Sequence, residues 1–393
     1  MSLVGVLGGS IRADVDALGN VAPHHTTWHL DWWIGADDRW RMPARETAVR
    51  QVQVDDVPVV QTAMRVPGGD AIERVYGVGI GGRDVIVLEI ENASPAPFVA
   101  ALVVRGAQSV AVEDAGVVVD RGTALVAPRA PSRWAVARGG TTEVEVCSGA
   151  ARSGPFPATQ DRAGRIEAAL LHPVPHRTTL RVGLTGPPMR GALPIAPDDL
   201  RRAPAAAAAA RGWKAQLDRG LRVVLPDERL SAAVRAARGQ ALLATTRPTA
   251  DDAMALEDWG FDAEAAEAWD VLSGRERKRA ARRPTQPSTW TEVRDARSGS
   301  ALLVALRGLL AHEHDDDVTL LAELPAEWRG QPVEVHDAPT RRGPLSYAVR
   351  WHGARPALLW DAPPGVTLRA PGLDPGWSTS EPAGEALLAG MAA

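Results

Sequence analysis

The chain has 393 residues, of which 45% are hydrophobic and 23% charged, and its formal net charge is −4. This length is enough for about two or three domains. The one long basic run, RERKRAARR at residues 275–283, falls at the end of a predicted helix, where cations favour the helix dipole, so we expect no nucleic-acid partner. The single cysteine, Cys147, excludes an intrachain disulfide.

The beginning of the sequence, MSLVGVLGGSIRAD, has no basic region and only a short apolar stretch. A signal peptide is therefore not expected. No apolar run reaches the roughly 18 residues that a membrane-spanning helix needs. We therefore expect a cytoplasmic protein that does not insert into a membrane.

Residues 1–186 are predicted to form an N-terminal β-sandwich. Short β-branched segments separated by turn residues recur here, among them 83–92, 97–106, 116–122 and 141–149. Many short strands at regular spacing are typical of a sandwich or barrel. Cys147 falls in the last of these segments, where it is expected to act as a small strand hydrophobe. The stretch GVGIGG at 77–82 leads into a strand rather than a helix, which favours a hairpin turn over a dinucleotide-binding loop.

Residues 187–226 are predicted to be a linker rich in proline and alanine that contains one helix. Residues 227–314 are predicted to form a helical-hairpin domain of four helices, since apolar residues recur at helical spacing. Thr289 and Glu292 have the spacing of a capping box and should open the fourth helix. The apolar stripe of that helix comprises Leu302, Leu306, Leu309 and Leu310.

Residues 315–393 are predicted to form a small C-terminal antiparallel β-domain. Hydrophobic and polar residues alternate in LSYAVRWHG (345–353), and the next segment, 355–361, should pair with it. The predicted fold class is therefore a multidomain β plus α protein: an N-terminal β-sandwich, a truncated α/α-hairpin domain and a small C-terminal β-domain.

The C-terminal third contains a motif with a family resemblance. Residues 325–328 read PAEW, and residues 338–346 read APTRRGPLS. A P-x-x-W step followed by an APT-x-x-G-x-[LV]-S hairpin resembles the junction between barrel and sheet in six-hairpin glycosidases of the amylo-α-1,6-glucosidase and rhamnosidase types. Residues 91–105 and 211–237 are similar to the sandwich strands and the barrel entry of the same enzymes. The resemblance implies an (α/α)6 barrel flanked by β-domains.

The helical segment departs from that family in its length. Twelve helices of about 11 residues with connections of about 5 need roughly 190 residues. Residues 227–314 number only 88. One chain therefore cannot close the barrel, and either hairpins were lost or another subunit supplies them.

Glycosidases of this family need two carboxylates on opposite sides of the scissile bond. The candidate catalytic residues are Glu257 and Asp258, which precede an indole, and Glu292, although a capping box already explains the last of these. The exposed end of a short helix is the alternative interpretation of Glu257 and Asp258. The glutamates Glu264 and Glu267 are expected to face solvent.

The stretch TTWHLDWWIGADDRWR at 26–41 concentrates tryptophans and acids, which suggests a carbohydrate platform. The candidate carbohydrate-binding residues are Trp32, Asp31 and Trp259. In a strand, Trp32 and its neighbour Trp33 would point to opposite faces, so at most one could line a site. The favoured alternative is that Trp28, Trp33 and Trp40 pack in the sandwich core or in its contact with the helices, because indoles bury large areas.

No metal ligand set or cofactor is predicted. The histidines His24, His25 and His29 are close in sequence, but the surrounding residues indicate loop or strand rather than a helix that would align them. HEHDDD at 312–317 is explained by an acidic turn after a helix. No phosphate-binding loop or nucleophile elbow is present.

The leading functional hypothesis is a glycoside-hydrolase-like protein that has a carbohydrate-related binding or regulatory role and no hydrolytic activity. The first alternative is an active glycosidase whose barrel is completed by a homo-oligomer through exposed helix faces. The second is a structural or partner-binding protein without glycan affinity, for which the basic run at 275–283 would supply a contact surface.

Overall fold

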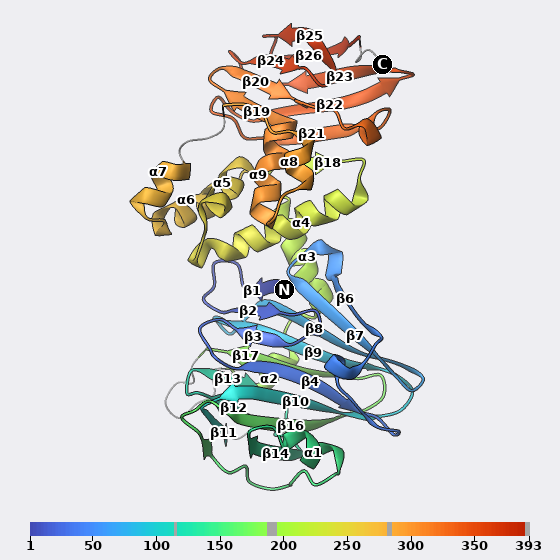
Figure 1. Ribbon diagram of the computed structural model, residues 1–393, viewed down its shortest axis with the longest axis vertical. Helices are drawn as coiled ribbons and strands as arrows, with labels where there is room; N and C mark the ends of the chain where they lie inside the picture. Colours follow the sequence, from blue (N-terminus) through green and yellow to red (C-terminus); the bar gives the residue numbers. More distant parts are fainter. Residues whose placement is uncertain (114–115, 187–194, 281–284, 390–393) are drawn as a thin grey trace. The chain divides into compact units, whose positions relative to one another are not determined.

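The computed structural model describes residues 1–113, 116–186, 195–280 and 285–389 (Figure 1). They form two compact units, Met1–Gly212 (unit 1) and Trp213–Ala393 (unit 2). The first eight residues of the predicted linker, 187–194, and the last three of the basic run, 281–283, lie outside the described residues.

Unit 1 contains two large sheets (Figure 1). The first has the order β1 (Ser2–Gly5), β2 (Arg12–Val15), β3 (Val21–Pro23), β4 (His29–Gly35), β10 (Phe98–Ala107), β16 (Ile166–Val174) and β14 (Arg133–Arg138), with β5 (Trp40–Arg41) paired to β4. The second has the order β15 (Thr159–Gln160), β11 (Ser109–Glu113), β12 (Gly116–Val119), β13 (Thr123–Val126), β17 (Thr179–Thr185), β9 (Arg83–Ala93), β8 (Gly69–Ile80), β7 (Val59–Val66) and β6 (Val49–Gln53). Helices α1 (Thr142–Cys147) and α2 (Pro197–Arg201) accompany them, and the boundary between the two units falls within α3 (Ala206–Leu217).

The two sheets of unit 1 share one hydrophobic core, which confirms the predicted β-sandwich. Strand β4 contributes alternate residues to it, Leu30 and Trp32 among them, and β9 contributes Leu88 and Ile90 from the other sheet. This alternation follows from the two-residue period of a strand. The glycines at 81 and 82 make the β8–β9 hairpin turn with positive φ values of 58° and 75°, so the stretch 77–82 is a hairpin, as predicted.

Residues 141–149 form a helix rather than the predicted strand. Helix α1 buries Thr142 and Val146, four residues apart, against the outer face of the first sheet, where Val146 belongs to a second cluster that includes Trp33. The Thr142 hydroxyl donates to the Glu167 carbonyl at 3.1 Å. Tertiary packing therefore overrides the β-branched pattern. Cys147 ends this helix and is exposed, contrary to the expected place in a strand.

Unit 2 begins with helices and ends with strands (Figure 1). Its helices within the described residues are α4 (Glu228–Leu243), α5 (Ala250–Asp258), α6 (Asp262–Val271), α7 (Gly274–Ala280), α8 (Trp290–Arg294) and α9 (Gly299–Leu310). The predicted capping box is present, since Thr289 and Glu292 bond each other's main chain at the start of α8. The predicted fourth helix is nevertheless two helices, because Ser298 caps a new one by accepting from the Ala301 N–H.

Two sheets complete unit 2. One has the order β18 (Arg222–Val224), β21 (Val333–Ala338), β22 (Leu345–His352), β23 (Arg355–Asp361) and β26 (Ala383–Leu387). The other has the order β19 (Ala311–His314), β20 (Asp317–Leu320), β24 (Thr367–Ala370) and β25 (Asp374–Thr379). The predicted β22–β23 hairpin is confirmed. One pairing differs from the antiparallel prediction: β20 and β24 are parallel.

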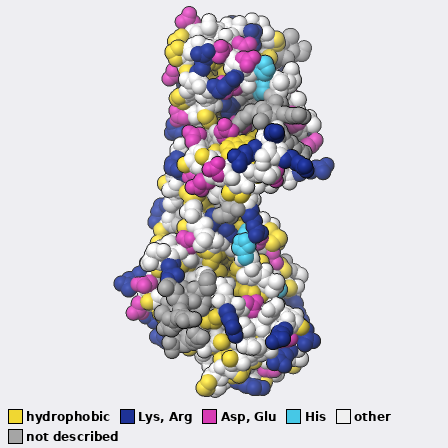
Figure 2. Space-filling view, turned by 90° about the vertical axis from the view of Figure 1, so that its left-hand side faces the viewer, with side chains coloured by type: hydrophobic (Ala, Val, Ile, Leu, Met, Phe, Trp, Pro, Cys, Tyr) yellow, Lys and Arg dark blue, Asp and Glu magenta, His cyan; other side chains and the backbone are white. Residues whose placement is uncertain are grey.

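Positive and negative side chains are interspersed over the face drawn in Figure 2. This mixture agrees with the small formal net charge of −4. Among the described residues, none of the helices is both long and apolar enough to cross a membrane.

Candidate functional site

Unit 2 contains a cavity of about 600 Å³ where the end of α5, helix α9, strand β19 and the turn after β21 meet. Volumes of this size accommodate small-molecule ligands. Its charged and imidazole lining residues are Glu257, Asp258, Asp262, Arg307, His312, Glu313, His314, Asp315 and Arg341. Two of the predicted catalytic residues, Glu257 and Asp258, therefore lie in one concave polar site.

Helix α5 places these two carboxylates at its C-terminal end. It starts with a capping box in which Thr249 accepts from the Asp252 N–H at 3.2 Å, and it ends at Asp258. Glu257 is exposed and Asp258 is half-buried. Acidic residues in the last turn oppose the helix dipole.

Trp259 anchors α5 instead of offering a stacking surface. Its indole is fully buried and donates to the Leu303 carbonyl on α9 at 3.0 Å. The Arg238 guanidinium lies 5.3 Å from the ring centroid, and burial lowers the pKa of Arg238 to about 10. The expected carbohydrate contact by this indole is thus not available, because packing occupies the ring.

The opposite wall of the cavity comes from β19 and from the turn after β21. Glu313 accepts from the Arg341 main-chain N–H at 3.0 Å, and the Arg341 guanidinium donates to the Asp315 carbonyl at 2.8 Å. The acidic stretch 312–317 is therefore a β-hairpin whose turn residue Asp315 has a φ of 53° and whose oxygens bind arginine. This agrees with the acidic turn predicted for these residues.

Arg307 is buried and His312 is half-buried in the same wall. Arg307 is 6% exposed and donates from Nη2 to the Pro339 carbonyl at 2.6 Å. Burial is the main cause that lowers the pKa of His312, and a hydrogen bond with the Thr285 main chain opposes it. This cause favours a neutral imidazole. Its Nε2 has no hydrogen-bond partner among the described residues.

A second, smaller cavity of about 300 Å³ adjoins the first. The two cavities share the lining residues Asp262, Pro339 and Thr340. Gly343, with a φ of 135°, lines only the second. The APTRRG motif, which carries the family resemblance, thus forms a wall common to both cavities.

The other half of that motif has a packing role. Trp328 is 1% exposed, and its ring centroid lies 5.2 Å from that of Trp290. The Trp290 indole donates to Glu327 at 3.0 Å, and the Trp290 N–H donates to Glu323 at 2.8 Å. The PAEW step therefore fastens helix α8 to the chain that follows β20.

The remaining carboxylate candidates in unit 2 lie outside both cavities. Glu292 accepts from the Thr289 N–H at 2.8 Å, so its oxygens serve the capping box. Glu264 pairs with Arg219 and its side chain is only 13% exposed, so the expectation that it faces solvent is wrong. Glu267 is exposed on α6, as expected.

Asp31 and Trp32 belong to unit 1, whereas the cavity-lining carboxylates belong to unit 2. Trp32 is 1% exposed and donates its indole N–H to the Leu18 carbonyl at 3.1 Å, so it has no face to offer a sugar. Asp31 accepts from the Trp33 indole at 2.9 Å and pairs with Arg105 at 3.3 Å. Burial is the largest cause that raises the pKa of Asp31. The packing alternative for these tryptophans is confirmed, including their opposite faces.

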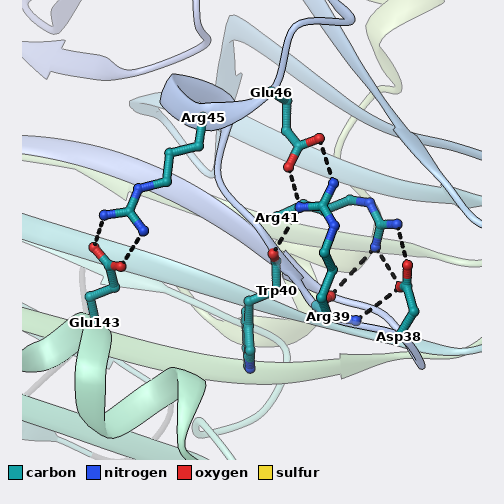
Figure 3. Close-up of polar contacts among 7 residues, drawn as sticks. All are labelled: Asp38, Arg39, Trp40, Arg41, Arg45, Glu46 and Glu143. Carbon is teal, nitrogen blue, oxygen red and sulfur yellow. Dashed lines mark hydrogen bonds and ion pairs between the residues drawn. The ribbon is translucent and has the colours of Figure 1, made fainter.

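The end of the tryptophan-rich stretch forms ion pairs rather than a ligand site (Figure 3). Arg39 donates to Glu46 at 2.9 Å and Arg41 donates to Asp38 at 2.6 and 2.7 Å, while the half-buried Trp40 points away from these pairs. The hydrogen bond from Arg41 is the main cause that lowers the pKa of Asp38 to about 2.

The histidine cluster near residue 25 does not gather around one point. His24 lies 3.1 Å from Asp14, and the ring centroids of His24 and His25 are 6.3 Å apart. Within the described ranges, no group of three or more His, Cys, Asp or Glu side chains is arranged to hold a metal ion.

Sequence reasoning missed Arg307, His312, Glu313 and Arg341 as parts of one site. The clusters HEHDDD and TRR were visible, but 26 residues separate Asp315 from Arg341 in the sequence. The pairing of β19 with β20 forms the turn that contains Asp315, and the pairing of β21 with β22 forms the turn that contains Arg341. No local sequence signal shows that these two hairpins lie side by side.

No protein-family model matches this chain, and no curated protein matches it. Among solved structures, the chain is similar to a bacterial glucoamylase complexed with acarbose, at 6% identity and a TM-score of 0.45, over 69% of this chain and 49% of that one. It is also similar to a family GH92 α-mannosidase from Bacteroides thetaiotaomicron, at 10% identity and a TM-score of 0.27, over 61% of this chain and 38% of that one. The chain thus spans about half or less of the length of these two structures.

Proposed function

We propose that unit 2 binds a carbohydrate in the larger cavity and does not hydrolyse it. The observation that carries this proposal is that carboxylate, guanidinium and imidazole groups from α5, α9, β19 and the turn after β21 line one concave site. Carboxylates accept from sugar hydroxyls, and arginine donates to them. The glycosidase-like APTRRG motif contributes part of the same wall.

The arrangement of the carboxylates favours binding over hydrolysis. Glu257 and Asp258 are consecutive on one helix, so they project about 100° apart from one element rather than from opposite sides of a substrate. Glycosidases need carboxyl groups on both sides of the bond, about 5 to 9.5 Å apart. Glu313 lines the opposite wall, but its oxygens accept from the Arg341 main chain.

Isothermal titration with maltooligosaccharides and rhamnosides tests the proposal. We expect wild-type binding that weakens in Glu257→Gln and Asp258→Asn, while the matched control Glu267→Gln, on the exposed side of α6, binds as the wild type does. Absence of binding to every sugar tested would favour the partner-binding alternative.

The second candidate function is an active glycosidase whose barrel is completed by another copy of the chain. It is motivated by the helical segment, which is too short to close such a barrel alone. It predicts a stable homo-oligomer in analytical ultracentrifugation at micromolar concentration and turnover of an α-glucoside or a rhamnoside. Turnover that is lost in Glu257→Gln or Asp258→Asn would replace the non-catalytic proposal with this one. A monomer without turnover would eliminate it.

A further inference from the structure

The turn formed by residues 339–343 determines the shape of both cavities in unit 2. Pro339 and Thr340 line the two of them, Arg341 lines the larger, and Gly343 lines the smaller. A displacement of this turn would therefore alter each cavity. The side chains that hold this turn in place therefore influence the shape of the binding site.

Strand β19 holds the turn from one side through a main-chain atom. The Arg341 N–H donates to both Glu313 oxygens, at 3.0 and 3.3 Å, and the Arg341 Nε lies 3.5 Å from the same carboxylate. The Glu313 side chain is 20% exposed, whereas that of Arg341 is 64% exposed. A hydrogen bond from an N–H to an ionised, partly buried carboxylate is stronger than one between neutral groups. Glu313 thus fixes the backbone of Arg341 and not only its exposed guanidinium.

Helix α9 holds the turn from another side, again through the main chain. Arg307 is almost fully buried and donates to the Pro339 carbonyl at 2.6 Å. Within the turn, the Thr340 hydroxyl donates to the Gly343 carbonyl at 2.6 Å. Two charged side chains from separate elements therefore form hydrogen bonds with the main chain of the turn, one at Pro339 and one at Arg341.

We propose that Glu313 and Arg307 are positioning residues. Their hydrogen bonds to the main chain, from Arg307 to Pro339 and between Glu313 and Arg341, give the larger cavity its binding-competent shape. This inference rests on the proposed function, since it concerns binding of carbohydrate at that cavity. Without these hydrogen bonds, a sugar must order the turn as it binds. Its apparent affinity is then reduced in proportion to the fraction of molecules whose turn already has the binding-competent shape. These hydrogen bonds act through the turn, so the proposal needs no contact between Glu313 and the sugar.

The test compares Glu313→Ala with Glu313→Gln in the full chain. Alanine removes the acceptor, whereas glutamine keeps an oxygen that can accept from the Arg341 N–H. Two quantities are measured: the sugar dissociation constant, and the rate of hydrogen exchange at the amides of Thr340 and Arg341. We expect alanine to speed exchange and to weaken binding, each by roughly tenfold, the value of one charge-assisted hydrogen bond. Glutamine should recover part of both losses, because its amide oxygen accepts as a neutral group.

Asp316→Ala is the matched control. Asp316 pairs with Arg342 at 2.8 Å and joins the same two turns, but neither residue lines a cavity. Its substitution should leave the dissociation constant within about twofold of the wild type, because an exposed pair contributes little. Melting temperatures of the variants establish that each remains folded.

Each outcome separates the two proposals. Faster exchange in Glu313→Ala with an unchanged dissociation constant would overturn the positioning role and leave carbohydrate binding intact. Weaker binding with unchanged exchange would overturn it too, because Glu313 would then contact the sugar directly. A wild type that binds no sugar would refute the proposed function and this inference with it.

Discussion

Glu73 lies on strand β8 in the interior of the sandwich, and replacing it with glutamine should change how the stability of unit 1 depends on pH. The residue is 1% exposed, and its Oε2 has no hydrogen-bond partner among the described residues. Gly19 covers it so closely that a Cβ there would lie 2.3 Å from Oε2. Burial first, and then the charges of Asp31 and Asp16, raise the pKa of Glu73 well above its usual value.

The sign of the effect follows from this raised pKa. Below the unfolded-state pKa, about 4.3, the carboxyl is protonated in both states and adds no pH dependence to the stability. Above it, the unfolded chain ionises while the folded group keeps its proton, so the folded state loses about 1.4 kcal/mol for each pH unit until the folded pKa is reached. Between pH 5 and pH 7 the loss amounts to at most about 2.7 kcal/mol. Glutamine does not ionise, so the Glu73→Gln variant does not show this loss of stability with pH.

The assay is urea unfolding of the wild type and of Glu73→Gln at pH 5, 6 and 7, with hydrogen exchange in strands β7 to β9 to assign the transition to unit 1. We expect the free energy of unfolding of the glutamine variant, minus that of the wild type, to increase with pH. Glu46→Gln should give a difference that stays nearly constant from pH 5 to pH 7, because the hydrogen bond from Arg39 lowers the pKa of Glu46 and the carboxylate is then ionised in both states over this range. A Glu73→Gln difference that is constant from pH 5 to pH 7 would refute the reasoning.

Three further predictions concern unit 2. Glu257→Gln should keep or raise the melting temperature, since it removes an acid from a helix C-terminus, yet weaken sugar binding in titration calorimetry. Glu292→Ala should destabilise unit 2 by about 0.5 to 1.5 kcal/mol in thermal unfolding, because the Thr289 N–H loses its acceptor in the capping box, and an altered sugar affinity would contradict its purely structural role. Trp259→Phe should cost about 1 to 3 kcal/mol, because the Leu303 carbonyl loses its indole donor; an unchanged melting temperature would show that water replaces that donor.

Local chemistry was enough to predict the class of each part of the chain. Alternation at period two predicts strands such as β22, and the spacing of Thr289 and Glu292 predicts a helix start, because both patterns depend on neighbours within a few residues. The same reasoning failed at α1, where the β-branched run TEVEVC becomes helical. There the outer face of the first sheet offers a place for Val146, and no local signal reports that surface.

The candidate site was only partly predictable for the same reason. Glu257 and Asp258 were recognised from residues adjacent in the sequence, and they do line a cavity. Trp32 and Trp259 were also adjacent to acids, but burial at or below 1% leaves their rings no surface for a ligand. Sequence pattern shows which residues are apolar and not how deeply each is buried.

The sequence by itself determined the β-sandwich, the helical segment and the C-terminal strands, since these depend on periodicity. Only the tertiary structure decided that Arg307, Glu313 and Arg341 meet at one wall with the end of α5. Those contacts join residues that are tens of positions apart in the sequence. The packing of α9, β19 and β21 within unit 2 brings them together, and no local pattern encodes it.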